Sequence, residues 1–541
     1  MRLTILGGGG FRVPLVHRAL LADRRRTGIT ELVLHDVDRG RLDAIGRVLA
    51  AQARDVPGAP ALVTTTDLDE AVTGADFVFC AIRVGGLRGR VVDERVALSA
   101  GVLGQETVGA GGISYGLRTV PEAHRIAARI ARFAPGAWTI NFTNPAGLVT
   151  EAMAAHLGDR VIGICDSPSG LVDRVVRAIG ADPAAVRVDY AGLNHLGWLY
   201  GVHPLGATGP VDPARPAVPA RPDGPAGPGN PAGPGNPARP ASPAGPGNPA
   251  RPASPAGPGN PAGPAGPVRT ADPTPRPAAV ASGGSRDASA ENGPGGAGLL
   301  GDLLDDPERL ASFEEGRLFG AGRLRELHAV PNEYLHYYYD AAGTLAAVRD
   351  AAHTRGEFLL GQQHRCYAEI AARDPLAAWL EAWREREATY MAENRELTGA
   401  GEREHDESRP AGYEGVALAV MRALAHDEPA TLILNVRNGG TLGVLDDDAV
   451  VEVPCTVTAA GAAPQRVAPL PAHGTELIRA VKTSERHVLE AVASGWRTSA
   501  VRAMAAHPLV GPEVAARLID AYRSEFPELA YLRPDQAGQA S

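Results

Sequence analysis

A cysteine and a histidine, two side-chain types that commonly bind metal ions, stand at the ends of two expected strands. Cys165 ends an apolar run that begins at Val161, and His195 follows a second run over residues 186–193. Ligands bind at the carboxyl ends of strands in open α/β sheets, so both side chains are expected to face one crevice. A thiolate and an imidazole leave metal positions open for substrate oxygens, as catalytic sites require. Taken singly, a buried cysteine is usually a core residue and a lone histidine is usually structural.

A glycine-rich turn separates the first expected strand from the first expected helix. It comprises Gly7, Gly8, Gly9 and Gly10. Backbone N–H groups and a helix N-terminus in that context can hold a pyrophosphate. A full dinucleotide fingerprint would have glycine where this chain has Arg12, so a plain tight turn is the alternative. Asp36 ends the second strand, where a carboxylate can accept from ribose hydroxyls and select NAD over NADP; its alternative role is a helix cap or turn.

Amide and guanidinium side chains follow two other expected strands. Asn141 and Asn144 lie in the segment NFTNPA, where their amides suit a sugar hydroxyl or the nicotinamide ribose. Asparagine and proline are also ordinary turn residues. Arg83, Arg88 and Arg90 follow the third strand, and an arginine there can hold a phosphate or sugar oxygen by a charge-assisted bond. Solvated surface charge is the alternative for each of these arginines.

Tyrosine is concentrated in one short segment, since four of the chain's twelve tyrosines lie within residues 331–339. Such clusters more often pack than catalyse. A phenol acts as a base only if its pKa of about 10 is depressed, which a nearby metal or cation would do.

A parallel sheet would bring these side chains together. The first 200 residues alternate short β-rich runs with helical patterns, which predicts an α/β fold with a parallel sheet covered by helices. Strands are expected over 3–6, 32–35, 77–82, 139–142, 161–165 and 186–193, and helices over 13–25, 39–55, 120–133 and 146–157. Later helices are expected over 300–325, 355–373, 377–394, 415–425 and within 474–528, with strands at 431–436 and 450–458. This second half is expected to close the substrate pocket, because a Rossmann half alone does not.

The segment 205–299 changes to Pro, Gly, Ala, Asn and Ser, and repeats the twelve residues GPGNPARPASPA from Gly233 and again from Gly245. Such a composition cannot bury enough apolar surface to offset its ordering entropy, which predicts a disordered insertion in a surface loop. A binding arm is the alternative. The expected parts are a Rossmann-like domain over 1–200, this insertion, and a C-terminal α+β domain for substrate and oligomerisation over 300–530.

Composition excludes several classes of protein. The chain has 541 residues, 44% of them hydrophobic, and a net charge of −9, which argues against a nucleic-acid partner and for a small-molecule one. Its four cysteines are far apart, so neither a disulfide framework nor a zinc knuckle is indicated. We find no secretory signal and no run of roughly 20 apolar residues. A cytoplasmic protein without a membrane segment is expected.

These segments together resemble glycoside hydrolase family 4, the NAD- and manganese-dependent glycosidases. The resemblance covers most of the chain outside the Pro/Gly-rich segment. It rests on the ordered motifs Gly7–Gly10, Ile82-Arg83-Val84-Gly85-Gly86, Asp93-Glu94, Gly104-Gln105-Glu106-Thr107, Gly111-Gly112-Ile113, Asn141-x-x-Asn144-Pro145, Cys165-Asp166, Asn194-His195, Asn332-x-Tyr334 and His353-Thr354-Arg355.

The resemblance implies a role for each candidate residue. Cys165 and His195 are implied as ligands of a divalent metal, most commonly Mn2+, Tyr334 as the base and Asp166 as an acid. Implied substrate contacts are Arg90, Asn144 and Arg355, and implied NAD contacts are Gly7, Gly8, Gly9, Gly10, Asp36, Ile82, Arg83 and Asn141. The implied fold is a Rossmann-like domain similar to lactate and malate dehydrogenases, followed by a mainly helical α+β substrate domain. A homodimer or homotetramer is also implied.

The implied reaction uses NAD although it is a hydrolysis. NAD oxidises C3 of the sugar, which acidifies the proton at C2; Tyr334 removes that proton, the aglycone leaves, water adds and C3 is reduced again. Most glycosidases use a pair of catalytic carboxylates, and the NAD-dependent family is an exception because this reaction does not need them. The substrates implied are 6-phospho-β-glucosides, such as phosphorylated cellobiose.

The motifs depart from the family pattern at some positions, and alternatives remain. Members acting on 6-phosphoglycosides often have Ser or Thr followed by an aromatic residue after the glycines, whereas this chain has Phe11-Arg12-Val13, so phosphate recognition is shifted toward Arg12. The segment Cys165-Asp166-Ser167-Pro168 is similar to phospho-α-glucosidases, while residues 84–87 and 332–339 are similar to the β group. Alternatives are a 6-phospho-α-glucosidase or α-galactosidase of the same family, an NAD-dependent 2-hydroxy-acid dehydrogenase, and an NAD-sensing scaffold.

Overall fold

The fold is built around one mixed β-sheet. The computed structural model describes residues 1–205, 298–389 and 412–534. The strand order is β3-β2-β1-β4-β5-β6-β10-β11-β7-β8-β9, with β12 pairing β11. The first six strands are β1 (Arg2–Leu6), β2 (Glu31–His35), β3 (Ala61–Thr65), β4 (Phe77–Cys80), β5 (Trp138–Asn141) and β6 (Val161–Gly163). They pair in parallel in the order 3-2-1-4-5-6 of a Rossmann sheet, which confirms the predicted fold class.

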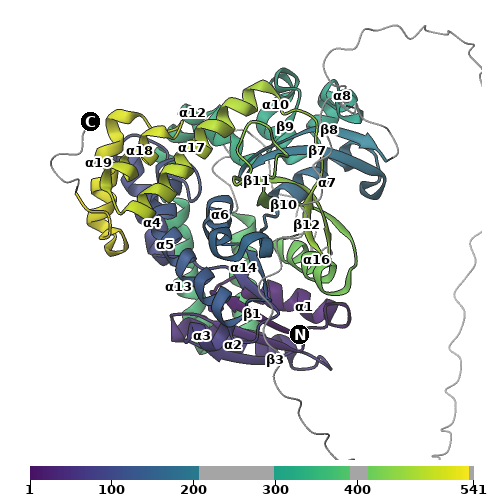
Figure 1. The fold of residues 1–541 in the computed structure, drawn as a ribbon, viewed down its shortest axis with the longest axis vertical. Helices are drawn as coiled ribbons and strands as arrows, with labels where there is room; N and C mark the ends of the chain where they lie inside the picture. Colours follow the sequence, from purple (N-terminus) through teal and green to yellow (C-terminus); the bar gives the residue numbers. More distant parts are fainter. Residues whose placement is uncertain (206–297, 390–411, 535–541) are drawn as a thin grey trace, which may run out of the picture. The chain divides into compact units, whose positions relative to one another are not determined.

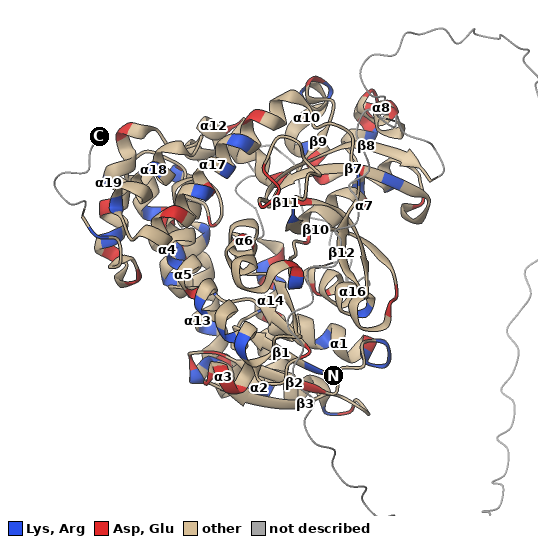
Figure 2. Ribbon diagram, viewed as in Figure 1, with Lys and Arg blue, Asp and Glu red and all other residues tan. Residues whose placement is uncertain are grey.

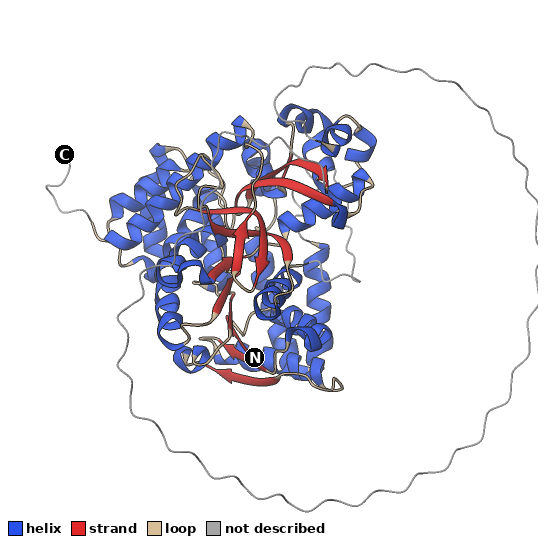
Figure 3. Ribbon diagram, turned by 45° about the vertical axis from the view of Figure 1, so that its right-hand side comes forward, coloured by secondary structure: helices blue, strands red, loops and turns tan. Residues whose placement is uncertain are grey.

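The N-terminal strands are short and apolar because both of their faces are covered. Leu3, Ile5 and Leu32 are completely buried, as expected for a parallel sheet between two helical layers. Helices lie on both sides of the strands (Figure 3). In this half they are α1 (Val13–Thr27), α2 (Arg39–Ala53), α3 (Leu68–Val72), α4 (Gly86–Ser99), α5 (Gly109–Phe133), α6 (Ala146–Leu157) and α7 (Ser167–Ile179).

Strands from the C-terminal part of the chain continue the same sheet. They are β10 (Ala430–Arg437), β11 (Val450–Thr458) and β12 (Gly461–Pro464). β10 pairs with β6, and β11 pairs with β7 (Val186–Leu193), so both lie between strands that are neighbours in sequence. Figure 1 shows β10 and β11 beside β7. The hairpin of β7 and β8 (Leu196–Pro204) then reaches β9 (Val330–Pro331).

The remaining helices belong to the second half of the chain. They are α8 (Leu299–Leu304), α9 (Pro307–Leu310), α10 (Glu314–Leu327), α11 (His336–Tyr339), α12 (Ala341–Asp350), α13 (Arg355–Ala372), α14 (Pro375–Ala388), α16 (Tyr413–His426), α17 (Ala472–Ser494), α18 (Arg497–Ala506) and α19 (Pro512–Glu525). The described residues all belong to one compact unit. The division into parts 1–200 and 300–530 stays a prediction.

Most expected elements are present, and the differences have physical reasons. The helix expected from 300 to 325 is wrong, because three short helices separated near Pro307 and Phe313 replace it. The helix expected over 120–133 begins earlier, at Gly109. Glycine has low helix propensity, but here it permits close packing: a Cβ at Gly112 would lie 2.5 Å from the carbonyl carbon of Thr107. Elements with no counterpart among those expected from the sequence are β3, β8, β9, β12, α3, α4, α7, α11 and α12.

The described residues carry mixed charge and no long apolar helix. Lys and Arg are interspersed with Asp and Glu along the helices (Figure 2). In the described ranges we find no helix that is both long and apolar enough to cross a bilayer. The expected insertion at 205–299 lies almost entirely outside the described residues.

Candidate active site

One cavity of 1870 Å³ opens at the carboxyl ends of the parallel strands, near the point between β1 and β4 where the strand order reverses. Open α/β sheets bind ligands at this place. The residues predicted from the sequence that line it are Gly7, Gly10, Asp36, Ile82, Arg83, Arg90, Asn144, Cys165, Asp166, His195, Tyr334 and Arg355. Residues from both halves of the chain therefore share one cavity wall.

The glycine turn after β1 is shaped for close approach. Gly7 has a φ of 83°, and a Cβ there would lie 2.4 Å from the carbonyl oxygen of Ala81. The Gly9 N–H donates to Asp36 Oδ2 at 2.9 Å, which fixes the carboxylate that directly follows β2 beside the turn. The first turn of α1 has no acidic residue. The Val13 and Leu15 N–H groups already donate to the Gly10 and Arg12 carbonyl oxygens, and Pro14 has no N–H. The helix dipole of α1, and not a free N–H group of its first turn, is therefore what would attract a pyrophosphate here.

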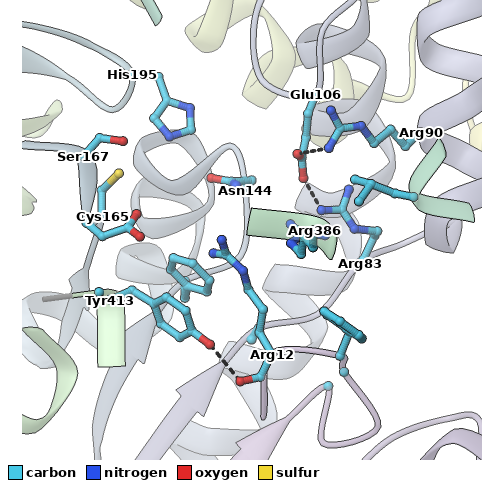
Figure 4. A pocket seen from close by; sticks show the side chains of 18 of the residues that line it. Arg12, Arg83, Arg90, Glu106, Asn144, Cys165, Ser167, His195, Arg386 and Tyr413 are labelled. Carbon is cyan, nitrogen blue, oxygen red and sulfur yellow. Dashed lines mark hydrogen bonds and ion pairs between the residues drawn. The ribbon is translucent and has the colours of Figure 1, made fainter. Parts of the chain in front are cut away.

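Cys165 and His195 lie on the same side of the cavity (Figure 4). Cys165 follows β6, and His195 occupies the turn between β7 and β8 with a left-handed φ of 62°. The His195 Nδ1 atom lies 2.7 Å from the hydroxyl oxygen of Thr107, so the Nε2 atom is the one left to bind a ligand. Burial lowers the pKa of His195 to about 4, which keeps the imidazole neutral, as a metal ligand must be.

The thiol and the imidazole fit a divalent cation. Burial, followed by the charges of Glu452 and Asp166, raises the pKa of Cys165, so a thiolate there requires a cation beside it. Among the described residues, no group of three or more His, Cys, Asp or Glu side chains forms a complete metal site. A cation at this place would take two protein ligands and leave its other positions for water or substrate oxygens.

Tyr334 stacks directly on the predicted metal ligand. The rings of Tyr334 and His195 are 3.7 Å apart between centroids and only 4° from parallel. Asn332 Oδ1 accepts from the Tyr334 N–H at 3.1 Å and so fixes the short helical turn Glu333–Leu335. Glu333 accepts from the Ser167 hydroxyl at 2.7 Å, and burial followed by Glu315 raises its pKa to about 7. This hydrogen bond joins the segment of Asp166 to the segment of Tyr334.

Two arginines that follow β4 are neutralised by carboxylates. Arg83 and Arg90 both form ion pairs with Glu106 (Figure 4). The Arg90 Nε atom also lies 2.8 Å from Glu94. Burial alone would raise the pKa of Glu106, but the two arginines hold it well below its usual range. The Glu94 carboxylate also accepts from the Gly356 N–H at 2.7 Å, which ties this cluster to α13.

Other arginines on the same wall form an electropositive group. Burial and then the charges of Arg12, Arg355 and Arg90 lower the pKa of Arg386 to about 9. The Arg386 Nε atom is buried, without a hydrogen-bond partner among the described residues. Arg12 lies over the ring of Tyr413 at 5.2 Å and extends into the cavity toward Asn144 (Figure 4). This wall is suited to an anion.

Three of the residues predicted to bind NAD lie outside the cavity wall. Asn141 is completely buried, and its amide donates to Thr143, Ala146 and Thr150 while accepting from the Thr143 N–H. Its side chain is thereby used to shape the turn that carries Asn144. Gly8 and Gly9 form the inner part of the glycine turn, and a Cβ at Gly8 would lie 2.7 Å from the Cβ of Leu34.

Glu106, Thr107, Glu333 and Arg386 belong to the site, although their place there is not predicted from the sequence. Glu106 and Thr107 stand in Gly-Gln-Glu-Thr, just before the glycines of α5, and that position could have marked them. Arg386 stands in Trp-Arg-Glu-Arg-Glu, which is typical of a solvated helix face, so no local signal identifies it.

Comparison with known proteins supports the sequence resemblance. The sequence models described as "Family 4 glycosyl hydrolase" and "Family 4 glycosyl hydrolase C-terminal domain" match residues 2–181 and 294–510. A probable 6-phospho-beta-glucosidase of Bacillus subtilis (strain 168) is 25% identical over 537 residues, which cover 98% of each chain. A 6-phospho-beta-glucosidase of Escherichia coli (strain K12) is 40% identical over 203 residues, 36% of this chain and 44% of that relative.

Solved structures show the same fold. A 6-phospho-beta glucosidase from Thermotoga maritima, determined with NAD and glucose-6-phosphate, aligns with a TM-score of 0.70 at 20% identity, covering 98% of this chain and 100% of that one. A 6-phospho-alpha-glucosidase from gut microorganisms, in complex with NAD and Mn2+, aligns with a TM-score of 0.68 at 20% identity, covering 98% and 99%. With both halves matched in order and one cavity lined by the residues of the family's motifs, the chain belongs to glycoside hydrolase family 4.

Proposed function

We propose that this protein hydrolyses 6-phospho-β-glucosides with NAD and a divalent cation, Mn2+ being the first candidate. The observation that carries the proposal is the stack of Tyr334 on His195, beside Cys165, in a cavity that also receives the glycine turn. A base, two soft metal donors and a nucleotide turn on one wall suit an oxidation followed by proton abstraction next to the new carbonyl. Relatives that act on, or were solved with, phosphorylated glucose compounds support the substrate class.

The chain's own residues prepare the substrate and move its protons. When bound, NAD would supply oxidation and later reduction at C3, and a cation held by Cys165 and His195 would act as a Lewis acid toward the neighbouring oxygens. Tyr334 takes the C2 proton, and a positive charge beside its ring lowers the pKa of a phenol toward that task. Asp166, at the start of α7, protonates the leaving oxygen. Asn144 holds sugar hydroxyls.

The 6-phosphate is assigned to the electropositive wall. Arg83 and Arg90 already have carboxylate partners, whereas Arg386 faces mainly other cations. A phosphate dianion between Arg386 and Arg12 would relieve that repulsion and receive charge-assisted bonds. Arg12 stands directly after Phe11 in the segment where the chain departs from the family pattern, so this additional cation takes over phosphate recognition.

The finer predictions rest on the family. The full-length relative from Bacillus subtilis favours the β-anomer, while α-glucosidases such as the one from Lacticaseibacillus paracasei, 36% identical over 200 residues, keep the α-anomer as the second candidate. A homodimer or homotetramer, a cytoplasmic location and the two-part division into cofactor and substrate domains belong to the same proposal.

Hydrolysis of matched chromogenic substrates tests the function. We would compare p-nitrophenyl 6-phospho-β-glucoside, its α-anomer and both unphosphorylated forms, with and without NAD and Mn2+. Cleavage of the phosphorylated β-anomer that needs both cofactors is expected. Preference for the α-anomer would select the second candidate, and cofactor-independent cleavage would refute the mechanism.

A further inference from the structure

A completely buried carboxylate stands where the C-terminal strands meet the hairpin that carries His195. Glu452 lies in β11, opposite Gly192 of β7, and has no exposed surface. Its carboxylate accepts three hydrogen bonds: from the Tyr190 hydroxyl at 2.8 Å, from Asn435 Nδ2 at 3.0 Å and from Asn194 Nδ2 at 3.3 Å. A buried carboxylate is rarely favourable for stability alone, because an apolar side chain of similar volume often does as well.

Asn194 connects this carboxylate to two parts of the active site. Its Nδ2 group donates to Glu452, and its Oδ1 atom accepts from the Ala146 N–H at 3.2 Å. Asn194 immediately precedes His195, and Ala146 closely follows Asn144. One side-chain amide therefore joins the turn with the metal ligand to the turn with the substrate contact.

The backbone of His195 needs such support. Its φ of 62° is left-handed, a conformation that non-glycine residues keep only where surrounding contacts hold it. Thr107 fixes the ring from one side through Nδ1, but it does not restrain the backbone. The nearest side-chain restraint in sequence is the Asn194 amide, and its donor group is directed by Glu452.

We propose that Glu452 is a positioning residue that acts through Asn194, holding His195 and the Asn144 turn at the separation that a bound cation and sugar require. The inference rests on the proposed cation site. It goes beyond the family assignment, because it gives strand β11, in the C-terminal part of the chain, a role in a site whose proposed metal ligands, Cys165 and His195, come from the N-terminal half. The proposal depends on hydrogen-bond geometry and not on the protonation state of any group.

The experiment measures Mn2+ binding without turnover. Free Mn2+ would be titrated by electron paramagnetic resonance against the full-length wild type and the variants Glu452→Ala, Glu452→Gln and Asn194→Ala. Tyr190→Phe is the matched control, since it removes the 2.8 Å hydrogen bond to Oε2 of the same carboxylate, whereas Asn194 donates to Oε1. Circular dichroism and melting temperature establish that each variant is folded.

Loss of an outer partner of a metal ligand typically weakens metal binding about 10- to 100-fold. We expect that loss for Glu452→Ala and Asn194→Ala, a smaller loss for Glu452→Gln, which keeps one acceptor oxygen, and unchanged Mn2+ affinity for Tyr190→Phe. Glu452→Ala and Asn194→Ala should also raise the KM for the phosphoglucoside, because the turn that carries Asn144 loses its support as well.

Three outcomes would overturn the inference. If folded Asn194→Ala binds Mn2+ like the wild type, the bridge has no positioning role, and this holds even if Glu452→Ala does not fold. If Tyr190→Phe weakens Mn2+ binding as much as Asn194→Ala, the effect is a general loosening of the core. If the wild type binds no Mn2+, the cation site fails, and the positioning role fails with it.

Discussion

Replacing Arg386 by methionine gives the sharpest test of the phosphate assignment. Methionine retains much of the apolar volume of arginine while removing its charge and donors. A hydrogen bond to a charged group contributes roughly 1.5–3 kcal/mol. Since about 1.4 kcal/mol corresponds to a tenfold change, kcat/KM for the 6-phospho-β-glucoside should fall about 10- to 100-fold. The kcat/KM for the unphosphorylated glucoside should be unchanged.

The same substitution should not destabilise the unliganded protein. Burial and the charges of Arg12, Arg355 and Arg90 lower the pKa of Arg386 to about 9, so the folded state binds this proton less tightly than the unfolded state. For a cation whose pKa is lower in the folded state, the destabilisation of the folded state is fully present below that folded pKa, and therefore at pH 7. Arg386→Met removes the cost, and its melting temperature without ligand is expected to equal or exceed that of the wild type.

The assay combines steady-state kinetics on both substrates with melting curves, and adds NAD titration by tryptophan fluorescence to separate a sugar phosphate from the cofactor pyrophosphate. Arg384→Met is the control, because Arg384 lies on the same helix but is exposed. Glucose 6-phosphate should raise the melting temperature of the wild type and of Arg384→Met more than that of Arg386→Met. Equal losses on phosphorylated and unphosphorylated substrates, or weakened NAD binding with normal phosphosugar kinetics, would refute the reasoning.

Three further outcomes are expected. Tyr334→Phe should keep NAD affinity and slow turnover by about 10²- to 10⁴-fold, since it removes the base; undiminished exchange of the C2 proton with deuterated solvent would contradict that role. Thr107→Val should weaken Mn2+ binding about 10- to 100-fold, because the Nδ1 atom of His195 loses its partner at 2.7 Å; wild-type affinity in a titration would count against it. Deleting residues 210–295 should leave melting temperature and turnover nearly unchanged, because Val202 and Gly298 on either side already pair in a parallel bridge; a large drop in either would show that the segment has a structural or catalytic role.

The parallel half of the sheet could be predicted from the sequence because its signals are local. Each strand there is an apolar run bounded by turn residues, and Gly7, Asp36, Asn144 and Cys165 stand at strand ends that a parallel sheet must place along one edge. Helix α4 was not recognised because its apolar positions are interrupted by Arg88, Arg90 and by buried carboxylates.

Residues whose role depends on distant contacts could not be predicted in this way. Arg386 becomes notable only when α14 brings it to Arg12, more than 370 positions away in the sequence. Glu452 alternates with apolar neighbours in Val-Val-Glu-Val-Pro, a pattern typical of a strand with one solvated face, yet its side chain is completely buried. In both cases tertiary packing, and not local preference, decides what the side chain does.

The placement of β10 and β11 also affects the order in which the chain can fold during synthesis. The first six strands pair among themselves, so the parallel part of the sheet can assemble soon after residue 163 has left the ribosome. β7 pairs with β8 early, but its other neighbour, β11, is synthesised only after residue 450. Contacts this far apart in sequence close late and slowly. We therefore expect the parallel strands that carry the glycine turn to form well before the second half of the chain closes the cavity, which happens only when translation is nearly finished.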